Sequence, residues 1–472
     1  MSVRDASYTP ITGISYCVTR HLFECYQAFA APDKETIKLL EKNKTRKWRD
    51  IVAESKKSNN FASRMTNEAT RLFIQQHRQE DVRLLALRGT KDPEVDLAFA
   101  LQQIDGYRRA QEKLPSWAAM EGILWPTHLS MEQCSSEQTA SYKAEVAGRG
   151  GLFVDLTAGF GVDAAFIAQG FQRAVCVELQ PELCAISSEN FRLLGLQQIE
   201  VVNGNGVEYL HTMPPADLIF IDPARRDEHG GRTYGIADCT PNVLDFIDEL
   251  LGKAQRVMIK LSPMLDWRKA VEDIGRQHVS AVHIVSVANE CKELILKVKG
   301  SKGEKVKESK GEKAKETKVV CMNLQPDGSR ECFEFDADAP SPIKILHSSR
   351  STLHFLYSPN ASIMKAGCFE LLAERFGVTP LHQNSHLFVS EQEVSDFPGR
   401  GFIIERTTSM NKRELKESLA GLTQANIAVR NFPISAEELH RRLKLRDGGD
   451  VYIFATTIEN LGHRLLICRK IS

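Results

Sequence analysis

The sequence contains no cysteine pair spaced as C-x-x-C, no long apolar run and no net charge. Its 11 cysteines are scattered between Cys17 and Cys468. Such a distribution fits reduced thiols better than a disulfide framework or a zinc site. No run approaches roughly 18 apolar residues, and the N-terminus lacks the basic and then apolar layout of a signal peptide. We therefore expect a cytoplasmic protein without a membrane segment or a metal.

The charge balance also excludes a global attraction to nucleic acid. Lys and Arg together number 61, as do Asp and Glu. Any contact with a polyanion must therefore come from local patches. Hydrophobic residues make up 42% of the 472 residues, which is enough for a substantial core. The length predicts two to four domains.

A central stretch contains four short, mainly apolar runs, each the length of one buried strand. These runs are Leu152–Val154, Ala174–Val177, Ile199–Val202 and Leu218–Ile221. Helix-length segments separate the first three, so the pattern predicts a β-α-β-α-β unit and a fourth strand in a parallel sheet. Ligands of open parallel sheets bind outside the carboxyl ends of the strands. A nucleotide-like ligand is expected there.

Residues at the ends of these runs have the chemistry that such a ligand needs. Gly159 and Gly161 let the backbone turn tightly and approach a ligand closely. Glu178 ends the second run, where a carboxylate can accept hydrogen bonds from both hydroxyls of a ribose. Asn205, after the third run, can donate to and accept from an adenine edge. Asp222 directly follows the fourth run.

These residues give the region a resemblance to the class I S-adenosylmethionine-dependent methyltransferase core. Asp155, Gly159 and Gly161 match its glycine-rich first motif, and Glu178 matches its ribose acid. The resemblance implies S-adenosylmethionine as cofactor and an α/β, Rossmann-like fold with a mostly parallel seven-stranded sheet. The cofactor-binding residues that it implies are Asp155, Thr157, Ala158, Gly159, Phe160, Gly161, Glu178, Leu179, Asn205, Gly206 and Asp222.

The resemblance continues beyond Arg226. Val257–Leu261 is the expected fifth strand and Ala281–Val287 the sixth. Glu293–Val298 and Val319–Leu324 are expected to form an antiparallel edge. Between them, residues 299–318 contain a nearly repeated, charged segment with few apolar residues, which predicts a flexible loop.

A dinucleotide oxidoreductase is the competing interpretation, because Gly159, Gly161 and Ala164 satisfy the dinucleotide spacing. In those proteins, however, the first glycine follows the strand almost at once and brings a pyrophosphate to the helix end. Here Asp155–Ala158 intervenes, and the carboxylate of Asp155 would face a pyrophosphate unfavourably. That carboxylate suits a cationic sulfonium and an amino group, so the methyltransferase is favoured.

The fourth motif, DPAR, contains the predicted catalytic residues Asp222, Pro223 and Arg225. Methyl transfer from a sulfonium mainly needs alignment, and Asp222 is the candidate for holding or deprotonating the nucleophile. Ala224 and Arg225 replace the second proline and the aromatic of the DPPY or NPPF pattern, which argues against adenine-N6 methylation.

Substrate contacts are predicted in the loop after this motif. Arg225 and Arg226 can hold a phosphate bidentately, or one of them pairs with the neighbouring acids Asp227 or Glu228. Tyr234, in a glycine-rich part of the loop, can stack on a base.

Apolar residues at three- and four-residue spacing predict a helical N-terminal domain over residues 1–130. The methyltransferase domain is expected over 131–338. Helices are expected over Phe61–His77, Val82–Leu87 and Val95–Lys113, the last beginning after Asp92 or Glu94. Another begins near Glu137, capped by Ser135 or Ser136. The segment around it is either a lid over the ligand mouth or a packing helix.

The C-terminal part predicts two small α+β domains, a ferredoxin-like α/β module over 339–397 and a second module over 398–472. Lys and Arg number 12 and Asp and Glu number 8 over 401–472, a net charge of +4 by subtraction. The segments DLTAGFGVD and EQCSSEQTASYKA resemble a bacterial branch of these methyltransferases with a C-terminal THUMP-like domain, distantly similar to trimethylguanosine synthases. This resemblance implies RNA as partner, with Arg441 and Arg442 as candidate contacts, although a basic helix face can equally be solvated.

Three functions remain open. The first is an active RNA methyltransferase that modifies a base or a ribose. The second is a non-catalytic RNA-binding protein on the same fold, and the third is a small-molecule methyltransferase. Asp155, Glu178 and Asp222 favour an enzyme, because a scaffold needs none of them.

Overall fold

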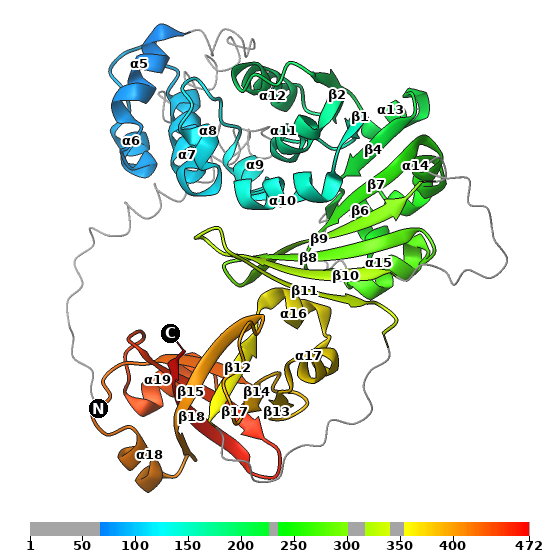
Figure 1. The fold of residues 1–472 in the computed structure, drawn as a ribbon. Coiled ribbons are helices and arrows are strands. Elements are labelled where there is room, and N and C mark those ends of the chain that lie inside the picture. Colours follow the sequence, from blue (N-terminus) through cyan, green and yellow to red (C-terminus); the bar gives the residue numbers. More distant parts are fainter. Residues whose placement is uncertain (1–66, 226–234, 301–316, 340–353, 472) are drawn as a thin grey trace, which may run out of the picture. The chain divides into compact units, whose positions relative to one another are not determined.

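The computed structural model describes residues 67–225, 235–300, 317–339 and 354–471 (Figure 1). Outside these ranges lie the expected helix start at Phe61, the loop residues Arg226 and Tyr234, and most of the charged insert. The chain forms two compact units, Met1–Phe220 and Ile221–Ser472, and each is described by itself. Within the described ranges, no helix combines the length and the apolarity that a membrane crossing requires.

The first unit begins with three helices around a small apolar core. They are α5 (Glu68–His77), α6 (Val82–Arg88) and α7 (Leu97–Lys113), and Leu85, Leu101 and Ile104 lie buried between them. The expected start of α7 at Asp92 or Glu94 is wrong. Asp96 caps this helix by accepting a 3.0 Å hydrogen bond from the Phe99 N–H, whereas Asp92 accepts from Glu94 within the preceding turn.

Three further helices precede the first strand: α8 (Pro115–Ala118), α9 (His128–Gln133) and α10 (Glu137–Ala147). Ser136 caps α10 by accepting from the Thr139 N–H, as predicted. The helix buries Ala140 and Tyr142 and packs against α11 (Val162–Ile167). This burial supports the packing alternative for the segment rather than the lid.

All four predicted strands of the first unit are present: β1 (Gly150–Asp155), β2 (Phe171–Glu178), β3 (Ile199–Asn203) and β4 (Ala216–Ile221). They are parallel, in the order β4-β1-β2-β3. The connections include α11, α12 (Pro181–Leu193) and α13 (Gly206–Thr212). Because the strands run in one direction, Asp155, Glu178 and Asn203 lie at the same edge of the sheet.

The second unit begins with a two-stranded ribbon, in which β5 (Ala224–Arg225) pairs with β6 (Cys239–Thr240). Its main α/β elements are α14 (Ile247–Lys253), β7 (Ala254–Leu261), α15 (Trp267–Ile274), β8 (Val279–Val287), β9 (Glu290–Lys299), β10 (Lys318–Leu324) and β11 (Arg330–Asp336). The strand order is β7-β9-β8-β10-β11. The fold class is α/β as predicted, but the two units contribute four and five strands, nine in place of the seven expected. Arg330–Asp336 is a strand that the sequence did not indicate.

The predicted antiparallel edge of β9 with β10 is wrong. Strand β9 lies between β7 and β8 and is antiparallel to both, whereas β10 runs parallel to β8. The reason lies in the turn: Ala288 and Asn289 have φ values of 49° and 65° and form a two-residue hairpin loop. Such a loop forces the two strands that it joins to pair with each other.

The C-terminal part of the second unit is one sheet, which we call the C-terminal sheet. Its strands are β12 (Phe355–Pro359), β13 (Thr379–Pro380), β14 (Phe388–Ser390), β15 (Gly399–Thr408), β16 (Asn426–Arg430), β17 (Val451–Ile458) and β18 (Gly462–Lys470). Their order is β13-β14-β12-β15-β18-β17-β16. The predicted boundary at residue 398 falls between β14 and β15, inside this sheet.

The helices of this part of the chain are α16 (Ala361–Ala366), α17 (Phe369–Phe376), α18 (Lys412–Ser418) and α19 (Ala436–Leu443). Of these, α16 packs against β8, β9 and β10. The helices α16 and α17 are separated by a short break. Gly367, with φ of 70°, ends α16 in the left-handed conformation, and its N–H donates to the Ile363 carbonyl.

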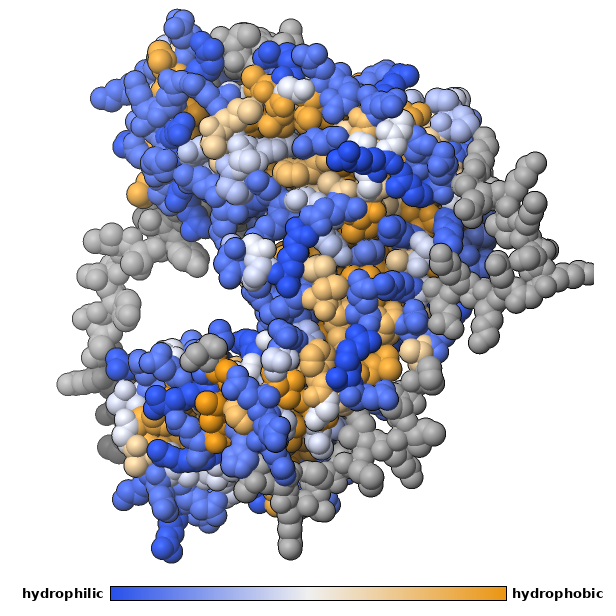
Figure 2. Space-filling view, viewed as in Figure 1, coloured by the Kyte–Doolittle hydropathy of each residue, from blue (hydrophilic) through white to orange (hydrophobic). Residues whose placement is uncertain are grey.

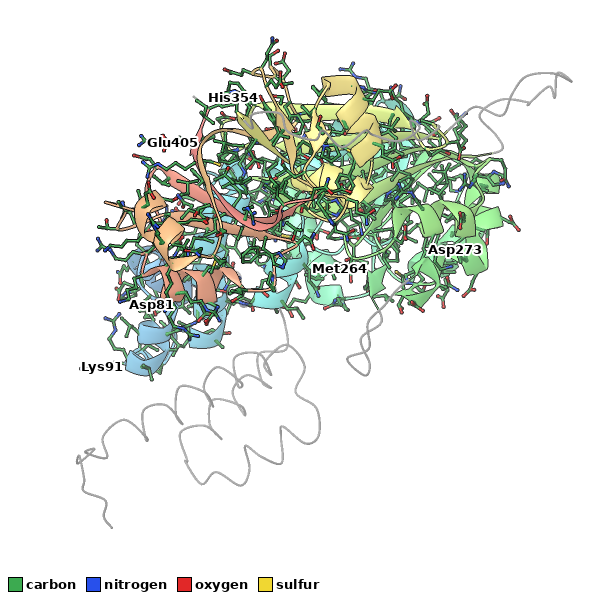
Figure 3. All side chains as sticks on the ribbon, turned by 90° about the horizontal axis from the view of Figure 1, so that it is seen from below. Asp81, Lys91, Met264, Asp273, His354 and Glu405 are labelled. Atoms are coloured by element: carbon green, nitrogen blue, oxygen red, sulfur yellow. The ribbon has the colours of Figure 1, made fainter. Side chains whose placement is uncertain are left out.

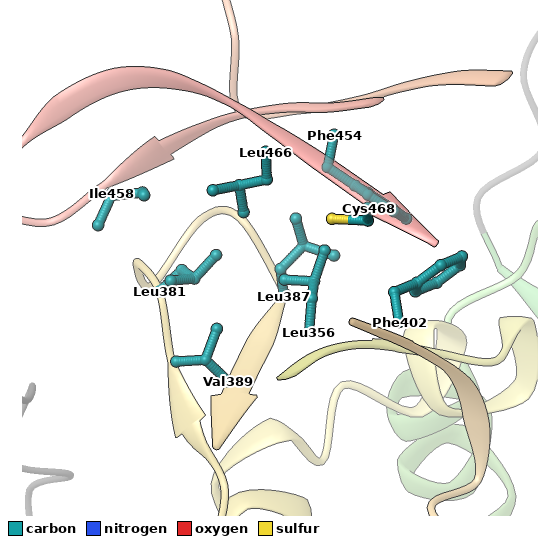
Figure 4. Close-up of a cluster of buried hydrophobic side chains, with 9 residues drawn as sticks. All are labelled: Leu356, Leu381, Leu387, Val389, Phe402, Phe454, Ile458, Leu466 and Cys468. Carbon is teal, nitrogen blue, oxygen red and sulfur yellow. The ribbon is translucent and has the colours of Figure 1, made fainter. Parts of the chain in front are cut away.

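The core of the C-terminal sheet joins its two halves (Figure 4). Nine buried side chains form one cluster: Leu356, Leu381, Leu387, Val389, Phe402, Phe454, Ile458, Leu466 and Cys468. The Glu459 N–H, just after β17, donates to the carbonyl of Leu381, just after β13, at 2.9 Å. The Asn431 amide, just after β16, also contacts His382 at 3.1 Å, so the sheet curls until its two edge strands approach each other. On the face shown in Figure 2, hydrophilic and apolar residues are interspersed over the described part of the chain, as on most globular proteins.

Candidate active site

The loop after β1 is held by backbone hydrogen bonds to both neighbouring strands. The Leu156 N–H donates to the Phe220 carbonyl on β4, and the Ala158 N–H donates to the Val177 carbonyl on β2, each at 3.0 Å. Gly159 and Gly161 then take φ values of 55° and 83°, and α11 begins at the next residue. The turn that the sequence predicted is therefore built at the carboxyl edge of the sheet.

The two glycines have different surroundings. A Cβ atom at Gly161 would lie 2.6 Å from the Phe191 ring, so this glycine allows α12 to pack closely. A Cβ atom at Gly159 would meet nothing nearer than the Thr157 carbonyl oxygen, at 4.0 Å. Gly159 therefore faces open space that a close ligand can fill.

Asp155 is a buried carboxylate at the end of β1. Its Oδ1 accepts a 2.9 Å hydrogen bond from the Thr157 N–H. On the neighbouring strand, burial and the charge of Asp155 raise the pKa of Cys176 well above its usual value. A buried negative charge at this edge favours a cationic ligand.

Glu178 joins the ends of the first two strands. Its Oε2 accepts from the Gly159 N–H and its Oε1 from the Gln180 N–H, both at 2.8 Å. These bonds fix the orientation of the carboxylate. Each carboxylate oxygen has a further lone pair with which it can accept a ribose hydroxyl.

Asn205 caps α13, because its Oδ1 accepts from the N–H groups of Val207 and Glu208 at 2.8 and 3.4 Å. Because Oδ1 already accepts these two hydrogen bonds, the contact that we predict with an adenine edge is one that Nδ2 of Asn205 donates. Gly206 lies so close to the first loop that a Cβ atom there would overlap the Leu156 carbonyl. The loops after β1 and β3 are thereby held together.

The side chains of two other predicted cofactor residues differ in their exposure. The ring of Phe160 is buried, with the Trp117 and Trp125 rings 5.3 and 6.2 Å away between centroids. Only the backbone of Phe160 is therefore available to a ligand at this edge. The side chain of Leu179 is 65% exposed and can cover an apolar ligand surface.

In the second unit, Asp222 comes directly after β4 and pairs with a lysine that the sequence did not single out. Its Oδ2 accepts from Nζ of Lys260, on β7, at 2.6 Å. Pro223 is buried, and Met264 stands exposed in the loop after β7 (Figure 3). The predicted substrate contacts Arg226 and Tyr234, and the side chain of Arg225, lie outside the described part.

The predicted RNA contacts Arg441 and Arg442 lie in the last turn of α19. Both guanidinium groups pair with Glu438 on the same helix, Arg442 at 2.7 Å. The net positive charge of this helix face is correspondingly smaller than the sequence suggests.

The sequence also did not indicate a buried ion pair between α10 and α11. Lys143, on α10, is fully buried with its Nζ 3.2 Å from Oδ1 of Asp163, in the first turn of α11. Ser135 donates to the other oxygen of Asp163 at 2.8 Å. A lysine in the buried face of a helix was the available signal, since a buried lysine needs an acid.

Two family models match parts of the C-terminal region, and a solved structure is similar to most of the chain. Residues 355–398 match a ferredoxin-like domain and residues 399–470 a THUMP domain-like family. None of the curated proteins matches the chain. A proposed methyltransferase from Porphyromonas gingivalis W83 is 31% identical, with a TM-score of 0.74, over 86% of this chain and 98% of its own.

More distant similarities cover about a third of the chain. An rRNA methylase from Streptococcus thermophilus is 18% identical, with a TM-score of 0.26, over 34% of this chain and 95% of its own. TrmK from M. capricolum, in complex with S-adenosyl-homocysteine, is 10% identical, with a TM-score of 0.28, over 35% of this chain and 68% of its own. These two are too distant to bear on the function. The extent of the similarity to the P. gingivalis protein decides the family: the chain belongs to the class I S-adenosylmethionine-dependent methyltransferases that carry a C-terminal THUMP-like domain.

Proposed function

We propose that this protein transfers a methyl group from S-adenosylmethionine to RNA, with the C-terminal sheet docking the RNA. The observation that carries the proposal is the match of residues 399–470 to the THUMP domain-like family, in a chain that also has the methyltransferase edge. THUMP domains bind RNA in modification enzymes. A small-molecule methyltransferase has no evident use for such a domain.

The residues of the first unit fit the cofactor. Gly159 leaves open space where the methionine part can approach, and the buried carboxylate of Asp155 suits its positive charges. Glu178 accepts from the ribose, and the Asn205 amide donates to the adenine edge. When bound, S-adenosylmethionine supplies an activated methyl group on a sulfonium.

Asp222 is the residue that we assign to the nucleophile. It follows β4, which pairs with β1 with Phe220 opposite Asp155. The 2.6 Å contact with Lys260 holds its carboxylate in one orientation, and Pro223 restricts the backbone beside it. From there Asp222 accepts a hydrogen bond, or a proton, from the amine or hydroxyl that receives the methyl group.

The substrate class is tested with tritium-labelled S-adenosylmethionine and separate RNA, protein and metabolite fractions. We expect label in the RNA fraction, and nucleoside mass spectrometry then identifies the modified atom. Label in metabolites alone would establish a small-molecule methyltransferase instead. RNA binding without label in any fraction would establish a non-catalytic RNA-binding protein.

Asp222→Asn tests the catalytic assignment. We expect methyl transfer to fall by about 100-fold or more, because a positioned proton acceptor contributes roughly that much. Binding of S-adenosylhomocysteine should remain measurable by calorimetry. Asp248→Asn, which removes the same charge at an exposed position of α14, is the matched control. Full activity of Asp222→Asn would remove Asp222 from the mechanism.

A further inference from the structure

Three nitrogen-containing side chains of the C-terminal sheet lie close enough for their charges to affect one another: Arg400, Arg430 and His386, which we call the cation cluster. Arg430 is the last residue of β16 and lies opposite Thr456 on β17. The buried hydroxyl of Thr456 donates to the buried hydroxyl of Ser385 at 2.9 Å. Ser385 immediately precedes His386, so this bond brings the histidine to the end of β16.

The imidazole of His386 is stacked on an aromatic ring. The residue takes φ of 51°, which is rare for a residue other than glycine. Its ring stacks on the ring of Phe369, on α17, with centroids 4.1 Å apart and an angle of 17° between the planes. The ring is therefore oriented before any ligand arrives.

Arg400 approaches His386 across β12, because it lies opposite Ser358 and the preceding Tyr357 lies opposite Phe388, two residues after the histidine. Arg400 also lies on the inner face of the sheet. It precedes Phe402 by two residues on β15, and side chains at this spacing share a face. Its Cζ lies 5.9 Å from the centroid of the Phe402 ring, which packs against Phe454 in the buried core (Figure 4). Phe454 lies opposite Ala428, two residues before Arg430, so both arginines emerge from this inner face.

No carboxylate of the described ranges forms an ion pair with either arginine. By contrast, Arg441 and Arg442 share Glu438, and Arg469 contacts Glu405 at 2.6 Å. Burial, followed by the charge of Arg400, lowers the pKa of Arg430. Burial and the charge of Arg430 also lower the pKa of His386. The fold thus holds like charges near one another, an arrangement that a bound anion would relieve.

We propose that Arg400, Arg430 and His386 form a phosphate-binding site for the RNA substrate, an inference that rests on the proposed function. A guanidinium fork matches a phosphate bidentately, and two of them can hold one phosphodiester or adjacent ones. Phosphate contacts fix the position of a strand without reading its sequence. The site would therefore orient RNA of varied sequence on the C-terminal sheet.

The test compares full-length variants in their binding of a fluorescent single-stranded RNA, measured by anisotropy at several salt concentrations. Arg400→Gln/Arg430→Gln should weaken binding about tenfold or more, as expected when charged hydrogen bonds are removed. The salt dependence should fall by about one counterion for each phosphate that the variant no longer binds. Arg173→Gln/Arg469→Gln removes the same formal charge from arginines paired with Glu200 and Glu405, and should change affinity less than twofold. Equal weakening of the two double variants would overturn the proposal.

Two forms of the RNA, with a 5′-phosphate or a 5′-hydroxyl, identify the phosphate. An equal fall in affinity on both assigns the site to an internal phosphodiester, whereas a fall only on the 5′-phosphorylated form assigns it to the terminal monoester. Unchanged affinity on both overturns the site. Methylation of RNA by the wild-type protein is measured in parallel, so RNA that is modified and bound equally well by Arg400→Gln/Arg430→Gln refutes the site alone.

A titration of inorganic phosphate covers the case in which the wild-type protein neither binds nor methylates RNA, which would refute the proposed function. The reporter is the imidazole of His386, followed by NMR of histidine-labelled protein. A bound phosphate should raise the pKa of His386 in the wild type and not in Arg400→Gln/Arg430→Gln. That result supports the anion site without RNA, and an unchanged pKa in the wild type refutes it.

Discussion

Gly159 and Gly161 stand two residues apart in one loop, yet a side chain at each would meet different surroundings. At Gly161 the Phe191 ring blocks a Cβ atom, so Gly161→Ala disturbs packing. At Gly159 the space is open, and a methyl group there would occupy the proposed cofactor position. The same motif therefore combines one glycine that close packing requires and one that faces open space.

Gly159→Ala should weaken S-adenosylhomocysteine binding by about tenfold or more in calorimetry, with a stability loss of roughly 1–2 kcal/mol from the left-handed backbone. Gly195→Ala is the matched control, since Gly195 has φ of 73° and nothing within 4 Å of its Cβ position. It should cost similar stability and leave cofactor affinity unchanged. If both variants bind the cofactor like the wild type, the ligand does not approach Gly159.

His283 should make stability depend on pH. Burial, with a smaller contribution from the charge of Lys297, lowers the pKa of His283 to about 4, against an ordinary value of about 6.5. In the unfolded chain His283 becomes protonated as the pH falls below about 6.5, whereas in the folded chain it becomes protonated only near pH 4. The stabilisation from this group is therefore fully present above pH 6.5 and is lost as the pH falls toward 4.

Urea unfolding at pH 7 and pH 4 measures this effect. The loss of unfolding free energy on acidification should be about 3 kcal/mol smaller in His283→Gln than in the wild type. His354→Gln, at an exposed histidine labelled in Figure 3, should behave like the wild type. The same acid sensitivity in His283→Gln would show that other groups cause it.

At the scale of elements, the buried pair of Lys143 and Asp163 connects α10 to α11, the helix that follows the glycine loop. Removal of one partner leaves a buried charge, and we expect Lys143→Met to cost about 3–5 kcal/mol in urea unfolding. Lys143→Met/Asp163→Leu removes both charges and should recover most of this loss. A single variant as stable as the wild type would mean that the pair is not stabilising α11.

The strand pairing in the second unit also belongs to this scale. Its apolar runs indicated the strands over 293–298 and 319–324, but their pairing followed from a turn. Ala288 and Asn289 are not a strong turn signature in the sequence, so the hairpin between β8 and β9 was not foreseen. Pairing is decided by such short connections as much as by the strands themselves.

At the scale of the whole molecule, the C-terminal sheet is a single folding element over the two matched families. Strand β15, which begins the THUMP-like range, pairs with β12 of the ferredoxin-like range. A chain that ends after Pro398 loses β15 and exposes the apolar face of Leu356 and Leu387. We expect this truncation to bind a hydrophobic dye and to be cleaved by protease within the remaining ferredoxin-like range, whereas the full chain resists. Protease resistance of the shortened chain would show that this range folds alone.

The sequence alone determined features that local chemistry decides. Apolar runs marked the strands, Ser136 marked the start of α10, and the spacing of Asp155, the glycines and Glu178 indicated the family. Such features depend on residues close together in the chain, so periodicity and cap chemistry suffice. Their roles in cofactor and substrate binding remain predictions.

Tertiary structure alone decided which distant groups meet. It paired Lys260 with Asp222 and Lys143 with Asp163, set Glu438 beside Arg441 and Arg442, and brought Arg400, Arg430 and His386 near one another in the C-terminal sheet. The physical reason is that a charge acts according to its distance from other charges and its burial, and both arise only when the sheet curls and the helices pack.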